Sequence, residues 1–192
     1  MRQRPLGTVL VIAVVLVCAA VVISGLRQAV KRPELPLSDV SIIREQATAK
    51  HLDPALIAAV IYAESKFEPR PSSAGAEGLM QILPATAYYL AHLSGGSSFT
   101  ASDLATPRVN VAYGSYYLRY LLDHYDGNEM LAVAAYNGGL ANVDRWRAQA
   151  AGAGKTLTAE AIPFPETREY VQRVLSAQRA YRATYPRELG PV

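Results

Sequence analysis

The chain has 192 residues, a formal net charge of +3 and a sequence pI near 9.0. This length suits one domain of about 150 residues with an appendage and excludes two large domains. The basic residues form no long run, which excludes a nucleic-acid-binding footprint, and a single cysteine, Cys18, excludes an intrachain disulfide or a cysteine-based metal cluster.

An apolar segment lies near the start of the chain. Residues 6–23 contain no charged side chain, and basic residues flank them on both sides. The run is long enough for one membrane-spanning helix, whereas a cleaved signal peptide would have a shorter apolar region. We therefore assign residues 1–30 to a membrane anchor or an uncleaved signal segment. The flanking charges do not fix its orientation.

The rest of the chain is predicted to be one helical domain. Pro33 and Pro36 indicate a linker over residues 31–37, followed by the domain over 38–185 and a tail over 186–192. Helices are expected over 38–51, 54–67, from Pro84 to the Gly/Ser-rich loop 94–98, and over 107–125, 128–138, 143–149 and 166–185. No segment shows the alternation of a strand, so the fold class is all-α.

Three helix starts carry specific signals. Ser38 or Asp39 is expected to cap the first helix, Asp53 precedes a proline at the first position of the second, and Asn128 is expected to cap the helix that stops at the Gly138–Gly139 pair.

Glu64 is the most informative carboxylate. Helical steps back from it reach Ile61, Val60 and Ile57, so its side chain leaves the helix on the face that buries these residues. Poor solvation of a carboxylate raises its pKa, as a general acid requires. Alone, this position favours an ordinary residue at the rim of a helix over a catalytic one.

Five segments place Glu64 in a wider pattern. They are YAESKFEP, SSAGAEGLMQILPATA, NVAYGSYYLRYLL, AVAAYNGG and IPFPETREYVQRVL. Each alone is weak, but in this order, over about residues 40–185, they resemble the catalytic domain of the soluble lytic transglycosylase family, which is related in fold to goose-type lysozyme. The resemblance implies a lysozyme-like helical domain with a long saccharide cleft, and it implies that peptidoglycan is the partner.

The resemblance also implies a mechanism with one carboxyl. Most glycosidases use two carboxylates, whereas in this family the substrate's N-acetyl group assists and its own 6-hydroxyl attacks the anomeric carbon. Glu64 would then be the acid and base that cleaves the bond between N-acetylmuramic acid and N-acetylglucosamine and leaves a 1,6-anhydro end. No metal or cofactor is implied.

Supporting residues follow from the same resemblance. Ser72 or Ser73 would line the cleft near the acetamido group; the spacing to the following glycine leaves the choice open, and either could be a plain loop hydroxyl. Gln81 would bind a sugar or cap its own turn. Tyr136 would point toward Glu64 or pack in the core. Glu166 would face Glu64 across the cleft, or only stabilise the first turn of its helix.

Other readings stay open. A hydrolytic lysozyme of the same fold would share nearly every motif, and a weakly active murein-binding module of an envelope complex is a third possibility. Since peptidoglycan lies outside the cytoplasmic membrane, we expect a single-pass protein with its domain on the cell-wall side. Six tyrosines that could offer ring faces to sugars are left unassigned: Tyr88, Tyr89, Tyr113, Tyr116, Tyr117 and Tyr120.

Overall fold

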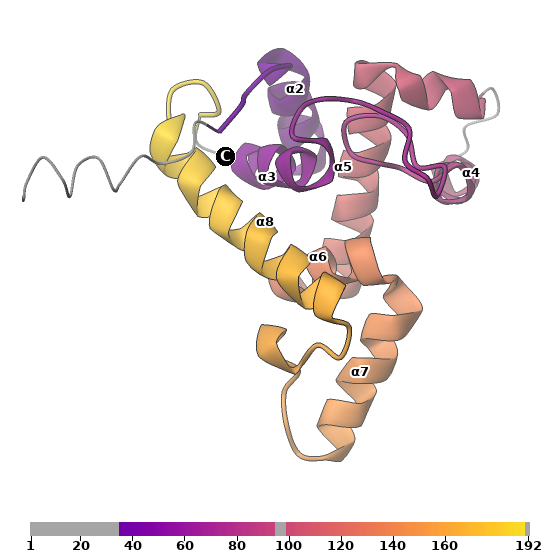
Figure 1. Cartoon of the computed structure of the whole chain (residues 1–192), viewed down its shortest axis with the longest axis vertical. Coiled ribbons are helices and arrows are strands. Elements are labelled where there is room, and N and C mark those ends of the chain that lie inside the picture. Colours follow the sequence, from indigo (N-terminus) through magenta and orange to yellow (C-terminus); the bar gives the residue numbers. More distant parts are fainter. Residues whose placement is uncertain (1–34, 95–98, 191–192) are drawn as a thin grey trace, which may run out of the picture. The chain divides into compact units, whose positions relative to one another are not determined.

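The computed structural model describes residues 35–94 and 99–190 (Figure 1). From Pro36 onward the described residues form one compact unit. Its α-helices are α2 (Val40–Lys50), α3 (Pro54–Ser65), α4 (Pro84–Ser94), α5 (Pro107–His124), α6 (Glu129–Gly138), α7 (Leu140–Gly152) and α8 (Pro165–Thr184), with short 3₁₀ helices η1 (Ala101–Ala105) and η2 (Ala159–Ala161).

The all-α prediction is confirmed for this part of the chain. Within residues 35–94 and 99–190 there is no strand, and the pairing closest to one is an isolated antiparallel bridge between Glu77 and Ile82. None of the helices there is both long and apolar enough to cross a membrane. The predicted span over residues 6–23 lies outside the described residues and stays a prediction.

Helix α3 lies at the centre of the unit. Its residues from Pro54 to Ile61 are all buried, which is typical of a helix surrounded by others. Helix α8 packs along α3 and also against α6, while α2 packs on α3 and α5 (Figure 1). The central helix therefore meets α2 and α8, which belong to opposite ends of the described chain.

Most predicted caps are confirmed. Asp53 accepts a hydrogen bond from the backbone N–H of Ala55, with Pro54 at the first helical position, and Asn128 accepts one from Leu131. The cap predicted for the first helix is wrong, because Asp39 has φ 53° and makes no capping bond; its carboxylate accepts from the Ser38 hydroxyl instead.

The predicted start of the helix around 143–149 is also wrong. Gly139 alone separates α6 from α7, with φ 84°, so α7 begins at Leu140. Glycine has no Cβ and therefore tolerates this positive φ, which lets the chain turn within one residue.

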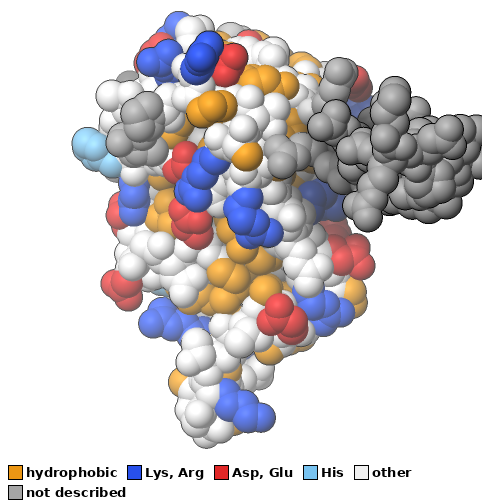
Figure 2. Space-filling model, turned by 90° about the vertical axis from the view of Figure 1, so that its left-hand side faces the viewer, with side chains coloured by type: hydrophobic (Ala, Val, Ile, Leu, Met, Phe, Trp, Pro, Cys, Tyr) orange, Lys and Arg blue, Asp and Glu red, His pale blue; other side chains and the backbone are white. Residues whose placement is uncertain are grey.

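Charge is mixed on the face of the molecule that Figure 2 shows. Figure 2 shows one face on which basic and acidic side chains are interspersed, with hydrophobic side chains between them. No broad patch of one sign covers this face, in agreement with the small net charge of +3.

Candidate active site

Glu64 lies in the last turn of α3, one residue before its C-terminal Ser65. Ile57, Val60 and Ile61 are fully buried, as the helical spacing predicts. After Ser65 the chain leaves the helix through Lys66 and Phe67, both with positive φ. The partly buried carboxyl therefore stands where a buried helix meets a turn.

The Tyr170 hydroxyl donates a 2.6 Å hydrogen bond to Oε1 of Glu64. Tyr170 is buried and lies on α8, 106 positions further along the chain. Its pKa is raised well above the usual tyrosine value, first by burial and then by the negative charge of Glu64. The hydroxyl therefore remains a proton donor near neutral pH.

Burial raises the pKa of Glu64 to about 7, and it is the largest of four effects. The Tyr170 hydrogen bond and the positive charge of Arg173 lower the pKa, while the negative charge of Glu166 raises it and is the weakest effect. The guanidinium carbon of Arg173 lies 5.7 Å from the centre of the Tyr170 ring. A substantial fraction of Glu64 is therefore protonated at neutral pH, as predicted for an acid catalyst.

Tyr136 lies near Glu64 without bonding to it. Its hydroxyl donates to the backbone carbonyl of Met80 at 3.0 Å. Burial, and then the negative charge of Glu64, raise the pKa of Tyr136 well above its usual value. The side-chain hydrogen bond to Glu64 thus comes from Tyr170, while Tyr136 bonds to the loop beside the carboxyl.

The segment 72–82 forms a tightly bonded loop. The Ser72 hydroxyl accepts from the backbone N–H of Ala76 at 2.9 Å, and the Ser72 N–H donates to the Ala76 carbonyl. Ser73 is exposed. Gln81 donates from Nε2 to the carbonyls of Arg70 and Gly78, both at 2.8 Å. The hydroxyl of Ser72 and the amide of Gln81 thus bond to the backbone in or next to this loop, whereas Ser73 is exposed to solvent.

Two polar residues that were not predicted anchor this loop. The fully buried Asn110 accepts from the Met80 N–H at 2.7 Å and donates to the carbonyls of Glu77 and Leu104. Ser65 donates to the Leu79 carbonyl at 2.8 Å. Ser65 directly follows Glu64, so this bond ties the end of the Glu64 helix to the loop.

A hollow lies between the end of α6 and the start of α8. Its lining includes Asn137, Gly138, Phe164 and Glu166. The Thr167 hydroxyl donates to Asn137 Oδ1 at 2.8 Å and so joins α8 to α6 at this hollow. Glu166 is exposed at the first turn of α8. The predicted cleft residue Glu166 therefore stands at an open hollow and acts electrostatically on Glu64.

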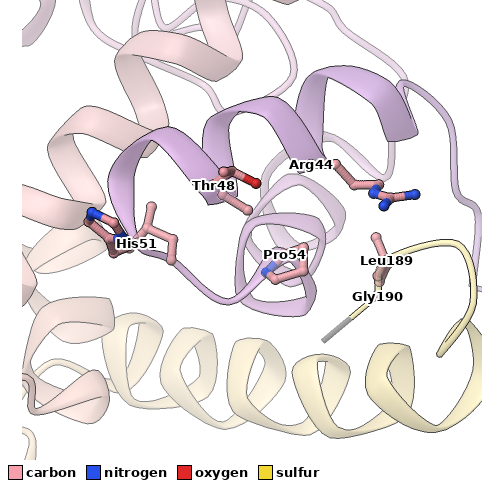
Figure 3. A pocket seen from close by; sticks show the side chains of 8 residues that line it. Arg44, Thr48, His51, Pro54, Leu189 and Gly190 are labelled. Carbon is pink, nitrogen blue, oxygen red and sulfur yellow. The ribbon is translucent and has the colours of Figure 1, made fainter. Parts of the chain in front are cut away.

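A second hollow lies away from the residues predicted for the site. It is lined by residues of α2, the start of α3 and the segment after α8, including Arg44, Thr48, His51 and Leu189 (Figure 3). None of the predicted site residues lines it. The candidate active site is thus the region around Glu64.

The chain belongs to the transglycosylase SLT domain family, whose model matches residues 41–158. The match ends before α8, so Glu166 and Tyr170 lie outside it. It includes Glu64 and the loop that follows.

Two relatives agree with this membership. The chain is 32% identical over 150 residues to the soluble lytic murein transglycosylase of Escherichia coli K12, which covers 77% of this chain and 23% of that protein. It is 37% identical over 134 residues to a putative soluble lytic murein transglycosylase of Haemophilus influenzae, which covers 68% of this chain and 22% of that protein. The chain thus spans about a quarter of these proteins.

Solved structures share the fold. The 70 kDa soluble lytic transglycosylase from Escherichia coli superposes with a TM-score of 0.74 at 30% identity, covering 81% of this chain and 26% of that one. An inactive glutamate-to-glutamine mutant of lytic transglycosylase Slt from Pseudomonas aeruginosa gives 0.71 at 31% identity, covering 84% and 27%. A further structure, with a TM-score of 0.72, is a complex of the 70 kDa enzyme with bulgecin A.

Proposed function

We propose that this protein is a peptidoglycan lytic transglycosylase with Glu64 as its catalytic acid and base. The observation that carries the proposal is the carboxyl of Glu64, whose burial raises its pKa to about 7 beside a single tyrosine donor. Membership of the SLT family and the murein-cleaving relatives support the same activity.

In the first step, protonated Glu64 donates its proton to the glycosidic oxygen. The bond from that oxygen to the anomeric carbon of N-acetylmuramic acid breaks, and the substrate's acetamido group assists at the carbon. The Tyr170 hydroxyl then stabilises the carboxylate that forms, because a hydrogen bond to a charged acceptor is stronger than one to a neutral acceptor.

In the second step, the Glu64 carboxylate accepts the proton of the 6-hydroxyl of the same sugar, and the 6-oxygen bonds to the anomeric carbon. The carboxyl is protonated again, and no water is consumed. A carboxyl with a pKa near neutrality suits both steps, since it both gives and takes a proton readily.

Product analysis of digested peptidoglycan tests the proposal. We expect mass spectrometry to find muramic ends lighter by one water than the products of hydrolysis, and we expect Glu64→Gln to abolish their release. Products at the hydrolytic mass would instead indicate a lysozyme of the same fold. Unchanged lysis by Glu64→Gln would contradict the catalytic role of Glu64.

Anchoring is a separate proposal. The uncharged run over residues 6–23 supports a single membrane-spanning helix with the domain on the cell-wall side, where the substrate lies. Protease treatment of intact spheroplasts checks it, because a protected domain would contradict this orientation.

A further inference from the structure

Exposed hydrophobic residues concentrate on one helix. Among the described residues, the large exposed hydrophobic side chains are Leu83, Tyr88, Tyr89, Leu93 and Phe164. The first four lie on α4 or immediately before it, and α4 contains no Asp, Glu, Lys or Arg. Exposed apolar and aromatic side chains that gather on one short segment in this way are typical of a binding surface.

Tyr89 is joined to the candidate active site by a row of tyrosine rings. Its ring centre lies 6.2 Å from that of Tyr120, and the two hydroxyls lie 3.2 Å apart. Tyr120 stacks on Tyr117 at 6.4 Å, and Tyr117 lies 5.3 Å from Tyr136. Since Tyr136 lies near Glu64, the row leads from the catalytic carboxyl to the surface of α4.

The chemistry of this row matches a saccharide. Tyrosine presents an apolar ring that the C–H face of a sugar can cover, together with a hydroxyl at its edge that can bond the sugar's own hydroxyls. Helix α4 contains no Asp, Glu, Lys or Arg, and His92 is its one basic side chain, so its surface does not favour a strongly charged headgroup or a strongly acidic or basic partner. Continuity with the Glu64 site favours the substrate itself over a separate ligand.

We propose that Tyr89 and Tyr120 form an accessory subsite that holds the glycan strand beyond the residues at the cleaved bond. The proposal rests on the proposed function, because it assumes that a β-1,4-linked strand of N-acetylated sugars lies at Glu64. Tyr89 supplies an exposed ring and Tyr120 a half-buried ring beside it. Long strands then bind more tightly than short ones.

Tyr88 provides a matched control. It adjoins Tyr89 on the same helix and is equally exposed, at 51% against 50%. Its ring packs against Phe99 at 5.3 Å, and Phe99 packs on Tyr113, so it belongs to a different cluster. Removing either tyrosine takes one ring of similar exposure from α4, but only Tyr89 contacts the row of rings that reaches Tyr136.

The test measures binding of β-1,4-linked N-acetylglucosamine oligomers to the full chain carrying Glu64→Gln, which prevents turnover. We expect Tyr89→Ala to weaken binding of the hexamer about tenfold, the effect of losing one well-formed aromatic contact, and to leave the dimer unaffected. Tyr88→Ala should leave both affinities unchanged, and Tyr89→Phe, which keeps the ring, should retain most of the hexamer affinity.

Equal effects of Tyr88→Ala and Tyr89→Ala on the hexamer would overturn the subsite, as would an equal loss for the dimer. Release of anhydro ends from murein by the unmutated chain is measured alongside. If that release is present while Tyr89→Ala has no effect on hexamer binding, the subsite is wrong and the proposed function stands. If release is absent, the proposed function itself fails.

Discussion

At Glu64 two opposing effects act on one carboxyl. Burial raises its pKa, and the hydrogen bond from Tyr170 is the strongest effect that lowers it. Burial alone would favour a proton held so tightly that donation becomes difficult, while the tyrosine stabilises the ionised form. The pKa of about 7 results from this opposition.

Tyr170→Phe should raise the pKa of Glu64. It removes the 2.6 Å hydrogen bond while keeping the ring that packs in the core. Hydrogen bonds to charged groups are worth roughly 1.5–3 kcal/mol, and about 1.4 kcal/mol corresponds to one pH unit. We therefore expect the alkaline limb of the pH profile of kcat/KM to move up by about one unit, measured on purified glycan strands.

Glu166→Gln is the opposing control. The negative charge of Glu166 raises the pKa of Glu64, so its removal should move the same limb slightly to lower pH. Shifts of both variants in the same direction would contradict the roles assigned to Tyr170 and Glu166. Wholly unchanged activity of Glu166→Gln would argue against any role of this carboxylate in the cleft.

The role of Tyr170 was not predicted, although the sequence contained a signal. Glu166 was predicted to face the cleft, and Tyr170 follows it by four residues, so both lie on one face of α8. What the sequence could not provide was the packing of α8 along α3, because 106 positions separate the two partners. The local helical period does locate Glu64, since its burial depends on residues three, four and seven positions before it.

At the level of elements, helix type and most boundaries followed from capping residues and prolines. The exceptions arise from backbone geometry. In the loop 72–82, Glu77 and Ile82 pair through both of their backbone groups, and Gln81 lies between them with φ 47°. Bonds from distant residues stabilise this conformation, so a local pattern could not reveal it.

Asn110 on α5 is the main support of that loop. Asn110→Ala would leave the Met80 N–H and the carbonyls of Glu77 and Leu104 without the bonds they now make to its amide. Each unsatisfied buried polar group costs about 1–3 kcal/mol. We expect the free energy of unfolding to fall by about 3 kcal/mol in urea titrations followed by circular dichroism, together with loss of activity.

Asn142 offers a comparison on α7. It is half-buried and donates to the carbonyl of Gly138, the last residue of α6, at 2.8 Å. Asn142→Ala should lower the free energy of unfolding by less than about 1 kcal/mol. A similar loss of unfolding free energy in both variants would show that the three hydrogen bonds of Asn110 contribute no more to stability than the bonding of Asn142.

For the molecule as a whole, the acid at Glu64 reduces stability. Its pKa rises from 4.5 to about 7 on folding, so the folded chain binds more protons than the unfolded chain between these values. The free energy of unfolding therefore decreases as the pH rises from about 4.5 to 7, and the full cost of the buried charge is present above that range.

Glu64→Gln should remove this cost. Relative to the unmutated chain, we expect the variant to be more stable at pH 8 by on the order of 2–3 kcal/mol, with no such gain near pH 4. Thermal unfolding at both pH values measures the difference. Glu68→Gln, an exposed carboxyl nearby, should change the melting temperature little at either pH; a gain at pH 8 equal to that of Glu64→Gln would contradict the explanation.

The contact between Tyr170 and Glu64 also has a consequence for biosynthesis. A nascent chain contains Glu64 long before it contains Tyr170, and the helix that covers the carboxyl is still to be translated. Until α8 docks, Glu64 is open to water and should behave as an ordinary carboxylic acid that has lost its proton at neutral pH. The carboxyl that we propose as the catalytic acid would therefore reach its raised pKa only once synthesis has passed residue 170 and α8 has folded onto α3.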